Sequence, residues 1–276
     1  MNSNGLNADE GACEETAIWR YMDLPRFVAM LAHRTLWFTK ARLFDDPYEG
    51  FCQVEYSKIL PPEAGPEWVT QEDGQGRTMM SVPRMLAGMS QRSATYFQNT
   101  REHLYVNSWC LADESMAMWE IYGSAGRGVA IQSSVERYKR AAKFTGIRPQ
   151  QYAFDAVKYH GDLASCPELQ LDLKSSIPMP GAGIWSKLLQ LGFHKRVCFE
   201  HEKEWRAALY QDHREDDGCN IDFDMDELIS AVFVGPRAAS FLLDVVWSIM
   251  NRFQFDKPLD KSALLCSPFI KTIESS

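Results

Sequence analysis

Short apolar runs, rich in aromatic and branched residues, recur along the chain between segments of helical periodicity. Runs of this length indicate β-strands, because amphipathic helices need longer periodic stretches. The expected strands lie at residues 18–22, 35–39, 105–110, 128–132, 152–159, 204–210, 231–235 and 262–266. The pattern predicts an α+β fold, in which helices intervene between the short strands of a mixed or split β-sheet.

Capping residues mark the starts of several helices. Asp23 precedes a periodic segment that has Pro25 in its first turn, where a missing N–H costs nothing. We expect Asp113 to cap the helix at 114–122, which Gly123 ends, and Ser133 to form a capping box with Glu136. Further helices are expected at 81–104, at 184–192 and after Pro236.

The positions of polar residues and of the Gly and Pro residues that interrupt helices and strands predict one domain. Residues 1–16 are polar and acidic, which predicts a disordered tail and not a signal peptide. Residues 17–270 are expected to form a single α+β domain, with a loop and helical excursion at about 51–104. No apolar run reaches the ~18 residues that a membrane span needs, so no membrane partner is expected.

Net charge and cysteine content limit the binding partners, the location and the metal sites that we expect for this chain. The formal net charge of −8 argues against a broad nucleic-acid-binding surface, although a local basic patch stays open. The seven cysteines are scattered and include no C-x-x-C pair. This pattern predicts a reducing cytoplasmic location and no structural zinc site.

The stretch F-E-H-E-K-E-W-R at residues 199–206 is the strongest candidate for a functional site. In a strand, Glu202, Glu204 and Arg206 share one face, while Trp205 lies on the other, apolar face. Arg206 could hold one carboxylate ionised through a bidentate pair. Two interpretations are open: a polar face directed into a cleft, or an edge strand whose charges are solvated.

Two other stretches carry candidate chemistry. In W-R-Y, Arg20 lies between two aromatic residues and could clamp a phosphate, or could simply pack on Trp19 at a rim. In F-D-D-P-Y-E-G, the side chains of Asp45, Asp46 and Glu49 could hold a hard cation, or could form an acidic turn capped by its own backbone. The spacing is not that of a calcium loop, and no metal is predicted.

Taken together, several of these stretches resemble the bacterial domain-of-unknown-function family 2971. The resemblance rests on W-R-Y-M-D-L, L-W-F-T-K-A-R-L-F-D-D-P-Y-E-G, S-W-C-L-A-D-E-S-M-A-M-W-E-I-Y-G, G-V-A-I and K-R-V-C-F-E-H-E-K-E-W-R, in that order over residues 18–236. It implies an intracellular α+β domain without naming an activity. The matched polar and aromatic positions are Arg20, Tyr21, Phe44, Asp46, Pro47, Glu49, Trp119, Tyr122, Lys195, Glu202, Glu204 and Arg206.

The order of elements is also similar, more remotely, to that of the ADP-ribosyltransferases. The shared layout is an arginine on the first strand, a middle strand ending in serine and a late strand entered through E-x-E. It implies an enzyme of toxin or defence type that uses NAD as substrate, with a protein or nucleic acid as acceptor. The resemblance implies that Glu204, Glu202 and Arg20 are catalytic, with Glu202 orienting the acceptor. The resemblance implies that NAD contacts come from Arg20, Tyr21 or Tyr122, Ser133 and, beside the glutamates, Arg206.

This layout has two departures from that group, and two other classes of function stay open. The chain has Q-S-S at residues 132–134 in place of S-T-S, and Arg206 stands beside the glutamates. One alternative is a metal-dependent nuclease that uses Asp46, Glu49, Glu202 and Lys203, although the spacing of glutamate and lysine differs from the restriction-type pattern. The other is a non-catalytic binding or regulatory module, in which the charges form an ion-pair network.

Overall fold

The computed structural model describes residues 13–50, 71–72, 78–79, 100–163, 188–211 and 216–266. The strands are β1 (Ala17–Met22), β2 (Thr35–Lys40), β3 (Gln71–Glu72), β4 (Thr78–Met79), β5 (Leu104–Cys110), β6 (Val129–Ser134), β7 (Ala142–Lys143), β8 (Tyr152–Ala156), β9 (Lys158–His160), β10 (His194–Arg196), β11 (Glu204–Tyr210), β12 (Gly218–Phe223), β13 (Ala231–Val234) and β14 (Leu259–Lys261). The α-helices are α1 (Leu24–His33), α3 (Thr100–His103), α4 (Met116–Ile121), α5 (Val135–Ala141), α7 (Met225–Leu228) and α8 (Ser240–Arg252). Short 3₁₀-helices are η1 (Ala41–Leu43), η3 (Pro149–Gln151), η5 (Leu191–Phe193) and η6 (Val197–Glu202).

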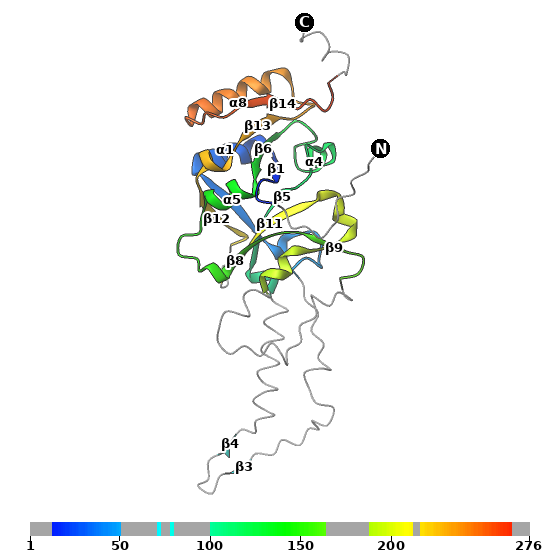
Figure 1. The fold of residues 1–276 in the computed structure, drawn as a ribbon, viewed down its shortest axis with the longest axis vertical. Helices are drawn as coiled ribbons and strands as arrows, with labels where there is room; N and C mark the ends of the chain where they lie inside the picture. Colours follow the sequence, from blue (N-terminus) through cyan, green and yellow to red (C-terminus); the bar gives the residue numbers. More distant parts are fainter. Residues whose placement is uncertain are drawn as a thin grey trace.

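A ten-stranded mixed sheet organises the described residues (Figure 1). Its main path runs β14-β13-β6-β1-β5-β2-β12-β7, and β11 joins it by pairing with both β5 and β8. The β13–β14 pair is parallel, whereas the other pairs of this sheet are antiparallel. Separate small sheets pair β9 with β10 and β3 with β4. The predicted α+β class with a mixed sheet is therefore confirmed.

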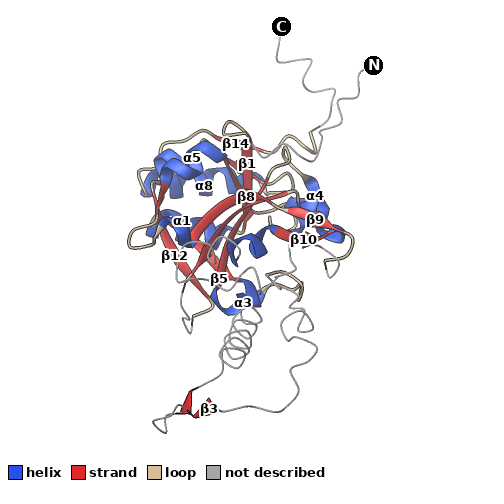
Figure 2. Ribbon diagram, turned by 60° about the horizontal axis from the view of Figure 1, so that its bottom comes forward, coloured by secondary structure: helices blue, strands red, loops and turns tan. Residues whose placement is uncertain are grey.

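Helices cover both faces of the sheet, and each face has its own core. On one face, side chains of α1, α5, α7 and α8 pack on the apolar residues of the central strands, as Phe27, Tyr138, Met225 and Val246 illustrate. In Figure 2, α1, α5 and α8 lie together on this side, whereas α4 lies beside β9 and β10. The opposite face has two smaller cores, one built on η5 and one on α4.

The sheet divides along one edge of β5. On its other edge, β5 pairs with β11 along its whole length. On the dividing edge, β1 pairs with β5 only at Cys110, and β2 pairs with it only at Tyr105 and Val106. Residues 107–109 have no strand partner there among the residues that the structure describes. The predicted alternative of a split sheet thus describes this part of the fold.

Two side chains bridge the opening in place of the missing backbone bonds. Asn107 Nδ2 donates to the carbonyl oxygen of Trp37 on β2 at 2.9 Å. Arg20 Nη1 donates from β1 to the carbonyl oxygen of Ser108 at 2.9 Å. Backbone polar groups that lose a ladder partner need another partner when they are buried. The split is therefore supported by specific polar residues on both of its sides.

Some predicted strand limits are wrong, and the pairing between strands shows why. The last strand is β14 and not residues 262–266, because its partner β13 ends at Val234, which pairs with Lys261. The expected strand at 152–159 breaks at Val157, where pairing passes from β11 to β10. Strand β12, which pairs with β2, was not predicted at all.

Two predicted helix caps are also wrong. Ser115, not Asp113, caps α4 and accepts a hydrogen bond from the amide of Met118. Ser134, not Ser133, caps α5: the Ser134 side chain accepts a hydrogen bond from the amide of Arg137, whereas the Ser133 hydroxyl donates to the carbonyl of Leu228. The predicted cap at Asp23 is confirmed, since its side chain accepts from the amide of Arg26.

Several predictions concern parts of the chain that the structure describes only in part. Most of the predicted tail at 1–16, most of the excursion at 51–104 and the first part of the helix at 184–192 lie outside the described residues. The single-domain prediction for 17–270 stays a prediction. In the described part of the chain, no helix has the length and apolar character to cross a membrane.

Candidate functional site

A cavity of about 800 Å³ opens at the split in the sheet. Side chains from α1, β1, β2 and β5 line one part of it, and side chains of the segment around Phe44, η6 and β11 line another. The volume is at the upper end of the ~300–1,000 Å³ range of small-molecule sites. The candidate residues Arg20, Tyr21, Tyr122, Glu202, Glu204 and Arg206 all contribute to the lining, together with Glu49 and Lys195.

The cavity connects the two faces of the sheet. Trp19, Cys110 and Glu204 pair across β1, β5 and β11, so their side chains share one face. Arg20 follows Trp19 in the strand, and alternation directs it to the opposite face. Both Arg20 and Glu204 nevertheless line the same cavity, together with His33 of α1. The opening between β1 and β2 therefore joins a cationic side to an acidic side.

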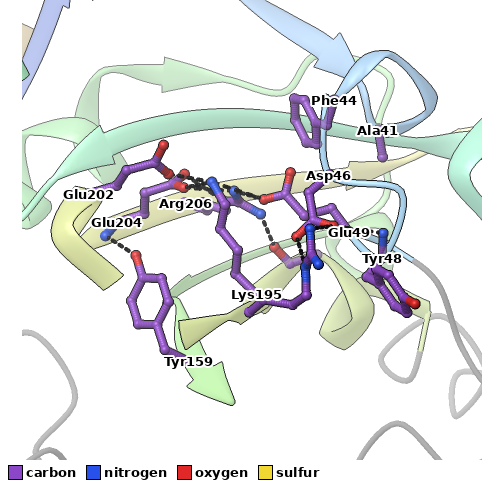
Figure 3. A network of polar contacts seen from close by, with 12 residues as sticks. Ala41, Phe44, Asp46, Tyr48, Glu49, Tyr159, Lys195, Glu202, Glu204 and Arg206 are labelled. Atoms are coloured by element: carbon purple, nitrogen blue, oxygen red, sulfur yellow. Dashed lines mark hydrogen bonds and ion pairs between the residues drawn. The ribbon is translucent and has the colours of Figure 1, made fainter. Parts of the chain in front are cut away.

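The acidic side holds a buried network of charges (Figure 3). Arg206 binds Glu204 in a bidentate manner, with Nε–Oε2 and Nη2–Oε1 distances of 2.7 and 2.9 Å. Its Nη2 also donates to Glu49 Oε1 at 2.5 Å. Lys195 contacts Glu202 and donates to Glu204 Oε1 at 2.8 Å. Three carboxylates against two cations leave the network with a formal charge of −1.

Strand alternation places this network. Trp205, Ala207 and Leu209 of β11 belong to the larger core, which leaves Glu204 and Arg206 on the other face. Every residue of β11 is buried, because β5 and β8 flank it on both edges. The alternative of an edge strand with solvated charges is therefore wrong.

The two glutamates have pKa values shifted in opposite directions. Burial alone would raise the pKa of Glu204, but Arg206 and Lys195 outweigh burial and hold it well below its usual range. For Glu202, burial raises the pKa and the neighbouring Glu204 raises it further, against the opposing effect of Lys195. Carboxyl groups with pKa values pushed apart in this way are suited to different roles, one as a fixed charge and one as a proton carrier.

Arg20 stands apart from these ion pairs. It is half-buried, and in the described part of the chain its guanidinium contacts no carboxylate. Its one hydrogen bond goes to Ser108, so the remaining N–H groups have no protein acceptor among the described residues. Burial lowers the pKa of Arg20 to about 10, which leaves it protonated at neutral pH. A cation held this way in a cavity is ready to bind an anionic group.

The other residues predicted to contact NAD are Tyr21, Tyr122 and Ser133, and two of the three line the cavity. Tyr21 lines the cavity, stacks against Trp19 and accepts a hydrogen bond on its hydroxyl from the amide of Ser115 at 2.9 Å. Tyr122 also lines the cavity, and its hydroxyl donates to Glu202 Oε1 at 2.8 Å. Ser133 does not line the cavity, because it is buried in β6 and donates to the carbonyl of Leu228 at 2.5 Å. The structure thus brings together all the predicted site residues except Ser133.

The acidic turn F-D-D-P-Y-E-G borders the site through ion pairs. Asp46 accepts from the amide of Tyr48 at 3.0 Å and pairs with Arg196 at 3.1 Å. Arg101 donates to carbonyl oxygens along the same turn, including that of Pro47 at 2.8 Å. Over the described ranges, no cluster of three His, Cys, Asp or Glu side chains is placed to hold a metal ion.

Reasoning from residues alone missed part of the site. Trp37 and Phe199 line the cavity, but each looked like an ordinary apolar residue of its segment. The sequence predicts Tyr159 only as the end of a strand, whereas its hydroxyl accepts a hydrogen bond from the amide of Glu204 at 2.8 Å. Lys195 was marked only by the family resemblance. These contacts arise between segments distant in the chain, and no local pattern encodes them.

Comparison with known proteins gives a family match and distant structural likenesses. Residues 118–207 match the model of a family described as "Protein of unknown function (DUF2971)". The resemblance to this family is thus confirmed over that segment, which contains Tyr122, Lys195 and the charged part of β11. No curated protein matches the chain.

Three of the similar solved structures are complexes of DarT from Thermus sp. 2.9. The complex with NAD+ has a TM-score of 0.37 and 10% identity, and covers 91% of this chain and 97% of that one. The complex with carba-NAD+ has a TM-score of 0.35 and 11% identity, covering 90% and 96%. The complex with ADP-ribosylated ssDNA has a TM-score of 0.35 and 10% identity, covering 91% and 96%. Because TM-scores this low do not establish function, the functional proposal rests on the cavity's own chemistry.

Proposed function

We propose that the protein is an ADP-ribosyltransferase-like enzyme, which cleaves NAD and transfers its ADP-ribose to a protein or nucleic acid. One observation carries the proposal. A single cavity through the split sheet holds Arg20, which has no carboxylate partner among the described residues, and a net anionic network around Glu204. No metal is part of the proposal.

The charge distribution of the cavity supports a dinucleotide of this kind. NAD carries an anionic pyrophosphate and a cationic nicotinamide ring. Arg20 offers to the phosphates the N–H donors that have no acceptor in the described part of the chain, and guanidinium groups match phosphate geometry. The network on the other side has a formal charge of −1, which favours the cationic end of the ligand. Tyr21, Tyr122 and Trp37 provide aromatic surface in the lining for stacking.

Cleavage of the nicotinamide–ribose bond develops positive charge on the ribose, much as in glycoside hydrolysis. A carboxylate fixed in place before the reaction stabilises that charge where it forms. Glu204 is suited to this role, because Arg206 and Lys195 fix its orientation and keep its pKa low. Glu202, whose pKa is raised, is suited to orient the acceptor. In this proposal, Arg206 positions Glu204 instead of contacting NAD.

The test is nicotinamide release from NAD by the purified full chain. We expect wild type to release nicotinamide and Glu204→Gln to lose about 100-fold or more of that rate, as is typical when one transition-state contact is removed. Glu227→Gln is the matched control, since Glu227 pairs with Arg140 at the surface. The Tm of each variant is measured, because Glu204 is buried in ion pairs. Absence of both nicotinamide release and NAD binding by wild type would overturn the proposal.

A second candidate is a non-catalytic module in which the network only stabilises the fold. It is favoured by the saturation of Glu204, whose two oxygens accept hydrogen bonds from both Lys195 and Arg206. In that case Glu204→Gln would lower the Tm, and no NAD-dependent activity would exist to be lost.

The nuclease alternative has less support. Lys203 is exposed in the left-handed turn between η6 and β11, with φ of 44°, and does not line the cavity. Asp46 is paired with Arg196. The described residues therefore do not gather the four side chains that this reading requires.

A further inference from the structure

The hydroxyl of Tyr122 connects the cavity to the buried Glu202. Tyr122 follows α4, and its hydroxyl donates to Glu202 Oε1 at 2.8 Å. Lys195 contacts the other oxygen, Glu202 Oε2. A phenol that donates one hydrogen bond keeps its oxygen lone pairs as acceptors. This bond gives Tyr122 a chemical role other than the stacking that the resemblance implied.

Tyr122 and Glu202 differ in exposure but line the same cavity. Tyr122 is 42% exposed, whereas Glu202 is 5% exposed. Both line the cavity, together with Glu204. A molecule bound in the cavity can therefore contact Tyr122 as well as the carboxylate. Through the hydrogen bond between them, a proton can pass from the phenol to Glu202.

We propose that Tyr122 takes the proton of the acceptor during ADP-ribosyl transfer and passes its own proton to Glu202. The inference rests on the proposed function, and it assigns the residue that contacts the acceptor. Glu202 is the final proton holder, and Lys195 is a positioning residue that fixes the carboxylate.

The step balances in atoms and electrons. A lone pair of the acceptor's oxygen or nitrogen forms a bond to C1′ of the ribose. The bond between C1′ and the nicotinamide nitrogen breaks, and its electron pair stays on that nitrogen, so that nicotinamide leaves uncharged. The acceptor's proton moves to the Tyr122 oxygen, while the Tyr122 proton moves to Glu202 Oε1. The products are the ADP-ribosylated acceptor, nicotinamide and a protonated Glu202.

The groups around Tyr122 and Glu202 favour proton transfer from the phenol to the carboxylate. Burial and the neighbouring Glu202 raise the pKa of Tyr122, so the phenol is protonated before the reaction. Burial and Glu204 raise the pKa of Glu202, which favours its holding a proton afterwards. The charged and titratable groups that face Glu202 from the packed elements are Glu49, Cys110, Tyr122, Tyr159, Lys195, Glu204 and Arg206.

Tyr122→Phe tests the step, because it removes only the hydroxyl. The assay is nicotinamide release from NAD, with water as the acceptor. We expect kcat to fall about 100-fold or more, as for loss of acid–base catalysis, with KM for NAD changed less than about twofold. Tyr152→Phe is the matched control and is expected to leave both constants unchanged, since Tyr152 packs between Phe144 and Phe154 and does not line the cavity.

Azide gives an independent readout, because it is a nucleophile that carries no proton. Sodium azide is expected to restore nicotinamide release by Tyr122→Phe and to leave Glu204→Gln inactive. The wild-type rate is expected to fall on the acid side as Glu202 becomes protonated, and azide should remove this fall. If Tyr122 only stacked on the ligand, Tyr122→Phe would keep the ring, would leave kcat nearly unchanged and would show no rescue by azide.

The outcomes separate this inference from the proposed function. Wild-type activity with an unchanged kcat for Tyr122→Phe overturns the inference and leaves the proposed function standing. A raised KM with unchanged kcat has the same meaning. Absence of nicotinamide release and of NAD binding by wild type overturns both.

Discussion

Two arginines of one cavity illustrate opposite ways of burying a guanidinium. Arg206 is bonded to Glu204, Glu49 and the carbonyl of Gly192, so its charge is compensated. Arg20 has only the carbonyl of Ser108 among the described residues. Burying a charge without an ionic partner costs stability, and proteins retain such groups mainly at functional sites. Arg206 therefore maintains the site, and Arg20 is available to a ligand.

Replacing each arginine by methionine should affect stability in opposite ways. Arg206→Met leaves Glu204 and Glu49 buried without their main partner, which should lower the free energy of unfolding by about 3–5 kcal/mol. Arg20→Met removes an uncompensated charge and should leave the free energy of unfolding unchanged or higher. Urea denaturation measures both, with the exposed Arg34→Met as control at under about 1 kcal/mol. A large loss for Arg20→Met would show that its charge has a stabilising partner.

The low pKa of Glu204 makes part of the stability depend on pH. The folded-state pKa lies below the unfolded value of about 4.3, so the contribution of Glu204 is present above that pH and is lost as pH falls through the folded pKa. We expect Glu204→Gln to have a lower Tm than wild type at pH 7, with a difference that narrows below about pH 4. Thermal unfolding at a series of pH values tests this. A difference that stays constant down to pH 2 would contradict the ion-pair account.

At the scale of elements, the split beside β5 opens the cavity that contains the candidate site. The strands that bound it, β1, β2 and β5, could be predicted from their apolar runs, and so could β11 with its two faces. Their pairing could not, because β5 pairs with β11 along its whole length but with β1 and β2 at only one and two residues. Strand β12 was missed because G-C-N-I-D-F is short and half polar, and its pairing with β2 is a tertiary contact.

Asn107 should be critical for the split. Its amide donates to Trp37, and its oxygen accepts from Trp109 Nε1 at 2.8 Å and from the Tyr138 hydroxyl at 3.1 Å. Asn107→Ala leaves these buried groups without partners, at about 1–3 kcal/mol for each group. Asn251→Ala on the exposed side of α8 is the control. Equal denaturation midpoints for the two variants would show that Asn107 does not maintain the opening.

At the scale of the whole molecule, the cavity unites residues that are far apart in the sequence and on opposite faces of the sheet. Arg20, Glu202 and Glu204 could be selected from the sequence because their residue types and strand positions stood out. That they share a cavity depends on the split, which no single segment encodes. Ser133 is a site candidate only through the resemblance to the ADP-ribosyltransferases, and in the structure its hydroxyl donates to the carbonyl of Leu228.

Titration calorimetry of NAD into wild type and Arg20→Met tests the central claim most directly. The account predicts one NAD site per chain for wild type and binding at least about tenfold weaker for Arg20→Met, because a charge-assisted contact to phosphate is worth about 1.5–3 kcal/mol. Unfolding data on the same samples show whether the variant is folded. No binding heat with wild type, or equal affinity of the two proteins, would contradict the claim that this cavity binds the dinucleotide through Arg20.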